Sequence, residues 1–257
     1  MSNYTSNDII NAIAAAAKAL EARKDEINRL NVFPVPDGDT GTNMSLTLAM
    51  VVDNLAKLPI GASSEDRRRA ITTGALMGAR GNSGVITSQI MRGLCEGIAD
   101  HEEFDIVAVD DAFSRAVEVA FNAVRKPVEG TILTVLRDTA TAAHKARKKK
   151  MELDEGLQFI VGESYASVQR TPELLPVLKE NGVVDAGGFG IAIFFDSFVA
   201  SLTGRAEAMV DELAFARTAA PKVEIEQIND WEGSKYKYCN EFLVNSETLD
   251  PEEALDF

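Results

Sequence analysis

Two carboxylates stand close together in a loop that is rich in proline and glycine. Residues 36–43 read Pro-Asp-Gly-Asp-Thr-Gly-Thr-Asn, so that Asp37 and Asp39 are separated only by Gly38. In proteins Mg²⁺ is usually held by one or two carboxylates together with substrate phosphates, and Asn31 can add a neutral oxygen. The spacing is consistent with a metal site, and the alternative is an ordinary turn in which an aspartate caps the next helix.

Glycines and small polar residues recur where the chain enters a helix, and the start of a helix attracts phosphate. The N–H groups that follow the carboxylates belong to Thr40, Gly41, Thr42 and Asn43. A second such loop covers residues 78–84, where we expect Gly81, Asn82, Ser83 and Gly84 to form an anion-binding turn. Arg80 in that loop is a candidate for stabilising charge on a phosphoryl group in transfer. A plain helix–helix connection is the alternative reading of this loop.

Two further segments complete the set of candidate loops. Residues 181–190 contain Asp185, Gly187 and Gly188 in an order that differs from a dinucleotide-binding fingerprint. Residues 128–131 end at Thr131, which opens another predicted helix. No G-x-x-x-x-G-K-[ST] pattern occurs in the chain, so a P-loop enzyme is excluded.

The elements that position these loops are predicted to be helices throughout the chain before Pro221. Apolar residues there recur at steps of three and four, which is the helical period. The expected helices cover residues 6–27, 42–55, 63 or 64 onward, 85–98, 105–125, 131–150, 155–168 and 190–202, with a short helix capped by Thr171 between the last two. We therefore predict an all-α fold. Only residues 235–244 resemble a strand, by partial alternation and aromatic content.

Composition and charge narrow the function further. The 257 residues carry a net charge of −14, which disfavours nucleic-acid binding through phosphate neutralisation. Residues 222–257 contain ten acidic and three basic residues, so the composition changes near Pro221. No run of about 18 apolar residues and no leader sequence is visible, so we expect a cytoplasmic protein without a membrane span. Cys95 falls on an apolar helical stripe and is predicted to lie in the core.

Three of these segments together resemble one family. Residues 31–44, 81–86 and 182–188 are similar, in the same order, to motifs of the dihydroxyacetone kinase L-subunit-like family, and the Phe-Pro-Val-Pro form at 33–36 resembles its bacterial fatty acid kinase branch. The resemblance covers about residues 6–205. It implies a closed barrel of about eight antiparallel amphipathic helices over residues 1–205, and a linker with the truncated start of a middle domain over residues 206–257.

The resemblance also implies roles for individual residues. ATP or ADP would bind with one or two Mg²⁺ ions, and Asp37 and Asp39 match two of the three aspartates that hold metal in the dihydroxyacetone kinases. The position nearest the remaining aspartate is Asn31, which is a departure from that pattern. Asn82 and Ser83 match a phosphate-contacting loop, Asp185 and Gly187 match a loop on the other side of the nucleotide, and Thr131 matches a helix start near it. Arg80 has no counterpart in that pattern.

The implied activity is phosphorylation of a fatty acid carboxylate to an acyl phosphate. In the family the fatty acid is presented by a separate fatty-acid-binding protein. The sequence leaves the oligomeric state open, with a homodimer as one option. Because the downstream domains of the family are missing, we expect the chain to bind nucleotide but to be poor at turnover. Two other functions stay open: a dihydroxyacetone-type phosphotransferase component, and a non-catalytic regulator that binds nucleotide or lipid.

Overall fold

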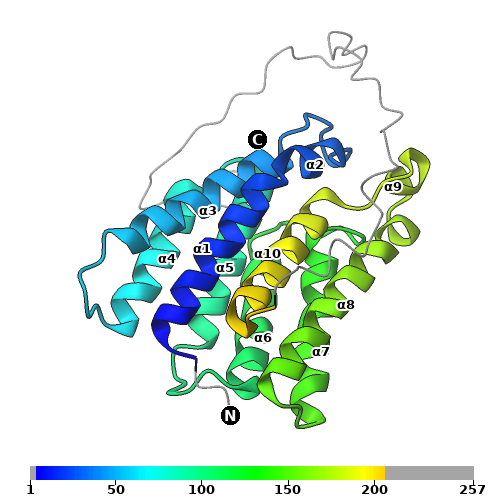
Figure 1. The fold of residues 1–257 in the computed structure, drawn as a ribbon. Helices are drawn as coiled ribbons and strands as arrows, with labels where there is room; N and C mark the ends of the chain where they lie inside the picture. The colour runs from blue at the N-terminus through cyan, green and yellow to red at the C-terminus, as the bar shows by residue number, and fades with distance from the viewer. Residues whose placement is uncertain (1–3, 206–257) are drawn as a thin grey trace, which may run out of the picture. The chain divides into compact units, whose positions relative to one another are not determined.

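The structure is a computed structural model that describes residues 4–205 (Figure 1). These residues form ten helices and no strand, which confirms the predicted all-α class. The helices are α1 (Ser6–Ala22), α2 (Lys24–Arg29), α3 (Thr40–Ala56), α4 (Ser64–Gly78), α5 (Gly81–Gly97), α6 (Ile106–Asn122), α7 (Ile132–Lys148), α8 (Leu153–Leu174), α9 (Pro176–Asn181) and α10 (Ala186–Thr203). The predicted strand at 235–244 and the rest of the acidic segment lie outside the described residues.

Eight of the helices form a closed ring. In the order α1, α3, α4, α5, α6, α7, α8 and α10, each helix packs against the next, and α10 packs against α1. Short connections between consecutive helices of a bundle make neighbours antiparallel, and α10 likewise runs opposite to both of its partners. The short helices α2 and α9 lie at one end of the ring (Figure 1). The predicted barrel of about eight antiparallel helices is therefore confirmed.

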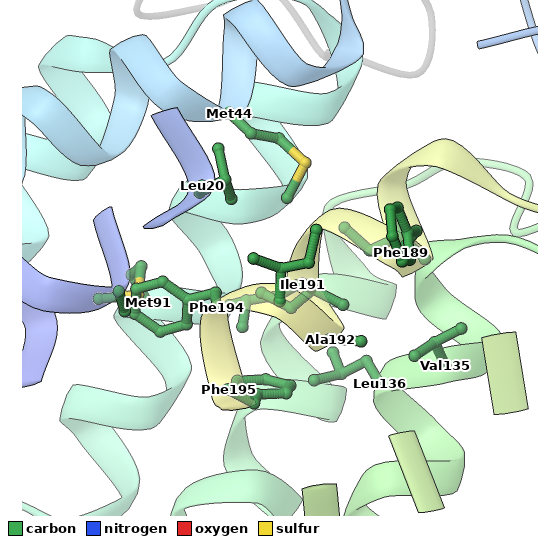
Figure 2. Packing of buried hydrophobic residues seen from close by; sticks show 14 of the residues in the cluster. Leu20, Met44, Met91, Val135, Leu136, Phe189, Ile191, Ala192, Phe194 and Phe195 are labelled. Carbon is green, nitrogen blue, oxygen red and sulfur yellow. The ribbon is translucent and has the colours of Figure 1, made fainter. Parts of the chain in front are cut away.

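The core of the barrel is organised around α10. Its side chains Ile191, Ala192, Phe194 and Phe195 pack among residues from the surrounding helices, including Leu20 of α1 (Figure 2). Phe195 also packs edge-on against Phe113 of α6, with ring centroids 5.0 Å apart. By length and composition α10 could cross a membrane, but 72% of its apolar window is buried among the other helices, as in the core helix of a bundle.

An apolar cavity of about 110 Å³ lies inside the barrel, toward the end opposite α2 and α9. It is lined by the C-terminal halves of α5 and α10 and by the N-terminal halves of α1, α6 and α8, with Ile13, Met91, Phe113, Ile160 and Phe198 among the lining residues. Cys95 also lines it and is 5% exposed, as predicted for a core residue. Burial raises the pKa of the Cys95 thiol to about 12, so this cysteine is not a reactive thiolate at neutral pH.

Local sequence sets several helix ends, and some differ from the predictions. The helix predicted over residues 6–27 is in fact two helices, because the chain bends at Arg23, whose guanidinium binds Glu26 at 2.7 and 2.9 Å. Thr171 does not cap a new helix as predicted. It lies inside α8, and its hydroxyl donates to the carbonyl of Val168. In a regular helix that carbonyl would accept from the N–H of residue 172, but Pro172 has none. The short helix starts instead at Pro176.

Two further helices begin earlier than the predictions placed them. Helix α5 starts at Gly81, where the prediction began it after Gly84, and α10 starts at Ala186, where the prediction began it at Gly190. In both cases the glycine-rich motif forms the first turn of the helix, although glycine weakens a helix when only intrinsic propensity counts. Packing against neighbouring helices overrides that propensity here. The earlier helix starts change which groups the motifs offer to a ligand.

Candidate functional site

Four helix N-termini gather at the end of the barrel that carries α2 and α9. Because neighbours in the ring are antiparallel, α3, α5, α7 and α10 all begin at this end. The first turn of a helix has N–H groups without intrahelical partners and carries a partial positive charge. This end of the barrel is therefore suited to an anion with several negative oxygens, such as a polyphosphate. All of the sequence-predicted loops lie here.

The two carboxylates of the first motif face each other in front of α3. Asp37 is exposed, while Asp39 is half-buried and directly precedes the helix without capping it. Burial raises the pKa of the Asp39 carboxyl, and its hydrogen bond to Asp37 and the charge of Asp37 raise it further, against a hydrogen bond from Asn43. Two carboxylates that meet in this way repel each other unless a proton or a cation lies between them.

Asn31 is the centre of a hydrogen-bond network behind this pair. Its side-chain amide donates to Asp37 Oδ1 at 2.8 Å and to the carbonyl of Val35 at 2.9 Å. Its amide oxygen accepts from the Thr40 hydroxyl at 2.5 Å. Asn31 and Thr40 are buried, whereas Asp37 is exposed, so the network joins the interior to a solvent-facing carboxylate.

The first turn of α3 offers fewer donors than its sequence indicates. The N–H of Thr42 donates to Asn28 Oδ1 at 3.1 Å, and the Thr42 hydroxyl accepts from Asn28 Nδ2 at 3.0 Å. The N–H of Asn43 bonds to the carbonyl of Asp39 inside the helix. The donors that remain for a ligand are the N–H groups of Thr40 and Gly41. Gly41 also has to be small, because a Cβ there would lie 2.3 Å from the carbonyl oxygen of Lys24 in α2.

The second motif lies directly against the first. A Cβ on Gly81 would sit 2.3 Å from Asn43 Nδ2, and the Ser83 hydroxyl lies 3.5 Å from the carbonyl oxygen of Thr40. The N–H of Gly84 is used inside α5, which leaves the N–H groups of Gly81, Asn82 and Ser83 at the start of the helix. The structure thus brings together two loops that are about forty residues apart in sequence.

Arg80 lies at the N-cap position of α5 and is exposed. Its guanidinium donates to the carbonyls of Met77 and Ala79 at 3.2 and 2.7 Å. These bonds are to exposed backbone groups, so the side chain can be redirected toward a ligand at low cost. The position is compatible with contact to a phosphate held by the neighbouring helix starts.

Asp185 and Thr131 occupy the other side of this end of the barrel. The Asp185 carboxylate caps α10 through the N–H of Gly188 at 2.7 Å and also accepts from the N–H of Ile132 in α7. Asp185 is 6% exposed, and burial raises the pKa of its carboxyl to about 6, against these two hydrogen bonds. Gly187 packs on Ile132, since a Cβ there would lie 3.2 Å from the isoleucine Cβ. The Asp185 carboxylate therefore links the start of α10 to the start of α7.

Thr131 precedes α7 and does not cap it through its side chain. Its hydroxyl donates to the carbonyl of Val128 at 2.8 Å. The adjacent Glu129 accepts from the Thr134 hydroxyl at 2.8 Å and from both terminal nitrogens of Arg137, at 2.6 and 2.7 Å. These bonds fix the loop that leads into α7. The start of α7 lies at the same end of the barrel as the other motifs.

Sequence reasoning missed two residues that organise the site. Asn28 on α2 holds the first turn of α3, and Thr171 on α8 accepts the N–H of Asp185 through its hydroxyl at 3.0 Å. Both are polar residues on helices. Asn28 belongs to no recognisable motif, and Thr171 was predicted only as a helix cap. The roles of the Asn28 amide and the Thr171 hydroxyl can be recognised only when the segment that each one binds is placed beside it.

The donor set at Asp37 and Asp39 fits a hard divalent cation that also binds phosphate oxygens. Among the residues that the structure describes, no three His, Cys, Asp or Glu side chains are placed to hold a metal ion by themselves. Mg²⁺ does not require such a cage, because it commonly takes one or two carboxylates, substrate phosphates and water. The paired carboxylates beside two helix starts meet that requirement.

Comparison with known proteins gives the same architecture. Residues 34–200 match the DAK2 domain. The fold resembles that of the dihydroxyacetone kinase from C. freundii, crystallised in complex with AMP-PNP and Mg²⁺, with a TM-score of 0.57 and 17% identity over 78% of this chain and 35% of that one. The native form of the same kinase gives a TM-score of 0.56 with 16% identity.

Relatives of higher sequence similarity occur in staphylococci. An uncharacterised protein of Staphylococcus haemolyticus (strain JCSC1435) is 40% identical over 236 residues, covering 90% of this chain and 42% of the relative. One of Staphylococcus aureus (strain MRSA252) is 40% identical over 250 residues, covering 94% and 45%. The chain spans less than half the length of these relatives. By the match that covers most of its barrel, the chain belongs to the DAK2 domain family.

Proposed function

We propose that the chain is the nucleotide-binding domain of an ATP- and Mg²⁺-dependent kinase that phosphorylates a fatty acid carboxylate presented by a separate fatty-acid-binding protein. The observation that carries the proposal is the meeting of Asp37 and Asp39 with the starts of α3 and α5. A pair of carboxylates and a set of helix N-termini together suit a metal–polyphosphate complex better than either would alone. The nucleotide and Mg²⁺ in the crystals of the similarly folded C. freundii kinase support this reading.

The residues have distinct proposed roles. Asp37 and Asp39 would hold the metal, while the N–H groups of Thr40, Gly41 and residues 81–83 would bind phosphate oxygens. Bound Mg²⁺ would neutralise the β- and γ-phosphate oxygens that otherwise repel an anionic nucleophile. Arg80 would stabilise charge on the phosphoryl group in transfer. The side of the site formed by α7 and α10 would contact the rest of the nucleotide.

The acceptor chemistry favours a carboxylate. A carboxylate oxygen attacks the γ-phosphorus, the bond from that phosphorus to the oxygen bridging to the β-phosphate breaks, and ADP leaves. A fatty acid is already ionised at neutral pH, so this transfer needs no general base. A hydroxyl acceptor such as dihydroxyacetone would need one, and the two carboxylates nearest the phosphate end are assigned to the metal.

Calorimetric titration of Mg-ATP into the chain tests the nucleotide site. We expect binding by the wild-type protein, loss of binding in Asp37→Ala and Asp39→Ala, and retained binding in Asp25→Ala. The last variant removes the same charge from an exposed position on α2, at the same end of the barrel. Unchanged melting temperatures would assign the loss to the site. Equal binding by all four proteins would contradict the proposed metal site.

The acceptor requires a second experiment. Radiolabelled ATP is mixed with the chain and either a fatty-acid-loaded binding protein or dihydroxyacetone, and the product is treated with hydroxylamine. Hydroxylamine converts an acyl phosphate to a hydroxamate and leaves a phosphate ester intact. Hydroxamate formation supports the fatty acid kinase, whereas a labelled ester from dihydroxyacetone supports the alternative phosphotransferase. A full-length relative in parallel separates a wrong acceptor from an incomplete chain.

A non-catalytic lipid-binding regulator is the second candidate, because the barrel holds a partly open apolar cavity. Its volume of about 110 Å³ is comparable to the ~150 Å³ engineered cavity that admits benzene. A long acyl chain would therefore extend beyond this volume. Binding of a fluorescent fatty acid to the chain, without phosphoryl transfer in the preceding experiment, would favour this candidate.

A further inference from the structure

The orientation of the Asn31 amide is fixed by its surroundings. The amide nitrogen faces two acceptors, Asp37 Oδ1 and the carbonyl of Val35, while the amide oxygen faces the Thr40 hydroxyl. Rotating the amide by half a turn would place its oxygen against a carboxylate and a carbonyl, neither of which can donate a hydrogen bond. Asn31 therefore presents N–H groups, and not an oxygen, to the metal-binding loop.

This orientation leaves Asn31 unsuited to coordinate a cation. Both of its N–H groups are already donated, and its oxygen points at the hydroxyl on the side away from Asp37. To serve as a ligand, the buried amide would have to break three hydrogen bonds and turn over. The Asp37 carboxylate, in contrast, has one oxygen fixed by Asn31 and the other free of it.

We propose that Asn31 is a positioning residue, which holds Asp37 Oδ1 and thereby directs Asp37 Oδ2 toward the metal, so that Asp37 and Asp39 are the only side-chain ligands from this loop. The inference rests on the proposed function and refines it. An aspartate at position 31 would place a third negative charge against Asp37 and could not donate to it. With asparagine at position 31, the side-chain ligands from this loop are thus two carboxylates, and the Asp37 carboxylate is held in one orientation.

A double-mutant cycle tests whether Asn31 acts through Asp37. Binding of Mn-ADP is measured by calorimetry for the wild type, Asn31→Ala, Asp37→Asn and the double variant. We expect Asn31→Ala to weaken metal-dependent binding by about 10- to 100-fold, the range found when a partner of a metal ligand is removed. In the Asp37→Asn background the same change should have little further effect. Additive losses would overturn the inference, because they would mean that Asn31 contacts the metal independently.

The number of water molecules on bound Mn²⁺ separates a positioning residue from a ligand. Water-proton relaxation of the Mn-ADP complex should be the same in the wild type and in Asn31→Ala, since no ligand is lost. An additional exchangeable water in Asn31→Ala would overturn the inference. Titration with ADP in the presence of EDTA provides a further readout, because a general structural defect would also weaken metal-free binding, whereas a positioning role would not.

Two further variants guard against misfolding. Thr40→Val keeps the backbone N–H but removes the hydroxyl that anchors the Asn31 oxygen, and it should weaken Mn-ADP binding less than Asn31→Ala does. Asn122→Ala removes an exposed asparagine at the end of α6 and should leave binding unchanged. Unaltered binding in both Asn31→Ala and Thr40→Val would overturn this inference alone. Absence of any metal-dependent binding by the wild type would overturn the proposed function as well.

Discussion

The backbone of Gly81 lies against the side-chain amide of Asn43, so closely that a Cβ at position 81 would sit 2.3 Å from Asn43 Nδ2. Asn43 in turn donates a hydrogen bond to Asp39, which meets Asp37. The start of α5 is thereby linked to the carboxylate pair through a single asparagine. A change at Gly81 should consequently reach the proposed metal site.

Gly81→Ala should impair both stability and nucleotide binding. Gly81 has a φ of +57°, a region that costs an L-residue roughly 1–2 kcal/mol, and the new methyl group would also displace Asn43 from Asp39. Gly182→Ala is the matched control, since Gly182 has a φ of +66° and no atom within 4 Å of an added Cβ. Urea denaturation should show a loss of stability in both variants, whereas calorimetry should show weaker Mg-ATP binding only in Gly81→Ala. Equal binding by the two variants would contradict the link.

Asp185→Asn should change how stability depends on pH. Because burial raises the pKa of Asp185 to about 6 from 3.8, the native state holds this proton more tightly than the unfolded state does. The stability contributed by the group is complete below pH 4 and is lost as the pH rises through 6, by about 3 kcal/mol in all. Between pH 5 and 7, which avoids the isoelectric point near 4.7, the wild type should lose about 1 kcal/mol relative to Asp185→Asn.

Urea denaturation of both proteins at several pH values measures this difference. Taking the difference between the two proteins cancels the titration of all groups that they share. A difference that stays constant from pH 5 to pH 7 would mean that Asp185 is ionised throughout. The fold would then depend on its two N–H donors more strongly than on its burial.

Arg80→Ala should lower the rate of phosphoryl transfer without changing stability. The guanidinium bonds only to two carbonyls of its own turn, so its loss leaves no buried partner unsatisfied. Removing one donor to a developing negative charge costs about 100-fold or more in kcat, and the affinity for Mg-ATP should change little. Arg69→Ala is the control, since Arg69 is an exposed arginine whose contact with Glu65 is 3.8 Å long. Equal rates for the two variants in the hydroxylamine assay would remove Arg80 from the mechanism.

Tyr165→Phe should destabilise the barrel without affecting nucleotide binding. The Tyr165 hydroxyl donates to Asp196 Oδ2 at 3.1 Å, and Asp196 is 0% exposed in the middle of α10. Loss of a donor to a buried carboxylate costs about 1–3 kcal/mol. Tyr4→Phe, which removes a hydrogen bond to Asp154 from a part-buried site, should cost less. The free energy of unfolding, measured with urea, checks both values, and a smaller loss for Tyr165→Phe than for Tyr4→Phe would be contrary to this expectation.

The order and class of the helices were predictable because their amphipathic pattern is local. The apolar stripe between residues 105 and 125 became α6, and the helix expected from Ser63 or Ser64 onward is α4, which Ser63 caps. Helix ends at glycine were less predictable. Gly81 and the glycines after Asp185 begin helices against their intrinsic propensity, because only glycine allows the close approach of Asn43 and Val135.

Part of the site was likewise visible in the sequence. The pairing of Asp37 with Asp39, the glycine-rich loops and the helix starts all follow from short motifs. The hydrogen bonds that individual groups already make within the protein do not follow from motifs. Thr42 is occupied by Asn28, and Asp185 joins α10 to α7 with its carboxylate buried. Such bonds join residues that are distant in sequence, so no local pattern encodes them.

By itself the sequence determined the helical class, the presence of an acidic or glycine-rich motif near several helix starts, and the residue types that suit Mg²⁺ and phosphate. Only the tertiary structure decided that four helix starts gather at one end, because this depends on the closure of an antiparallel ring by α10 against α1. It also decided the role of Asn31, whose amide orientation is fixed by Asp37, Val35 and Thr40. Residue type specifies what a group can do, whereas packing specifies which of its bonds are already made.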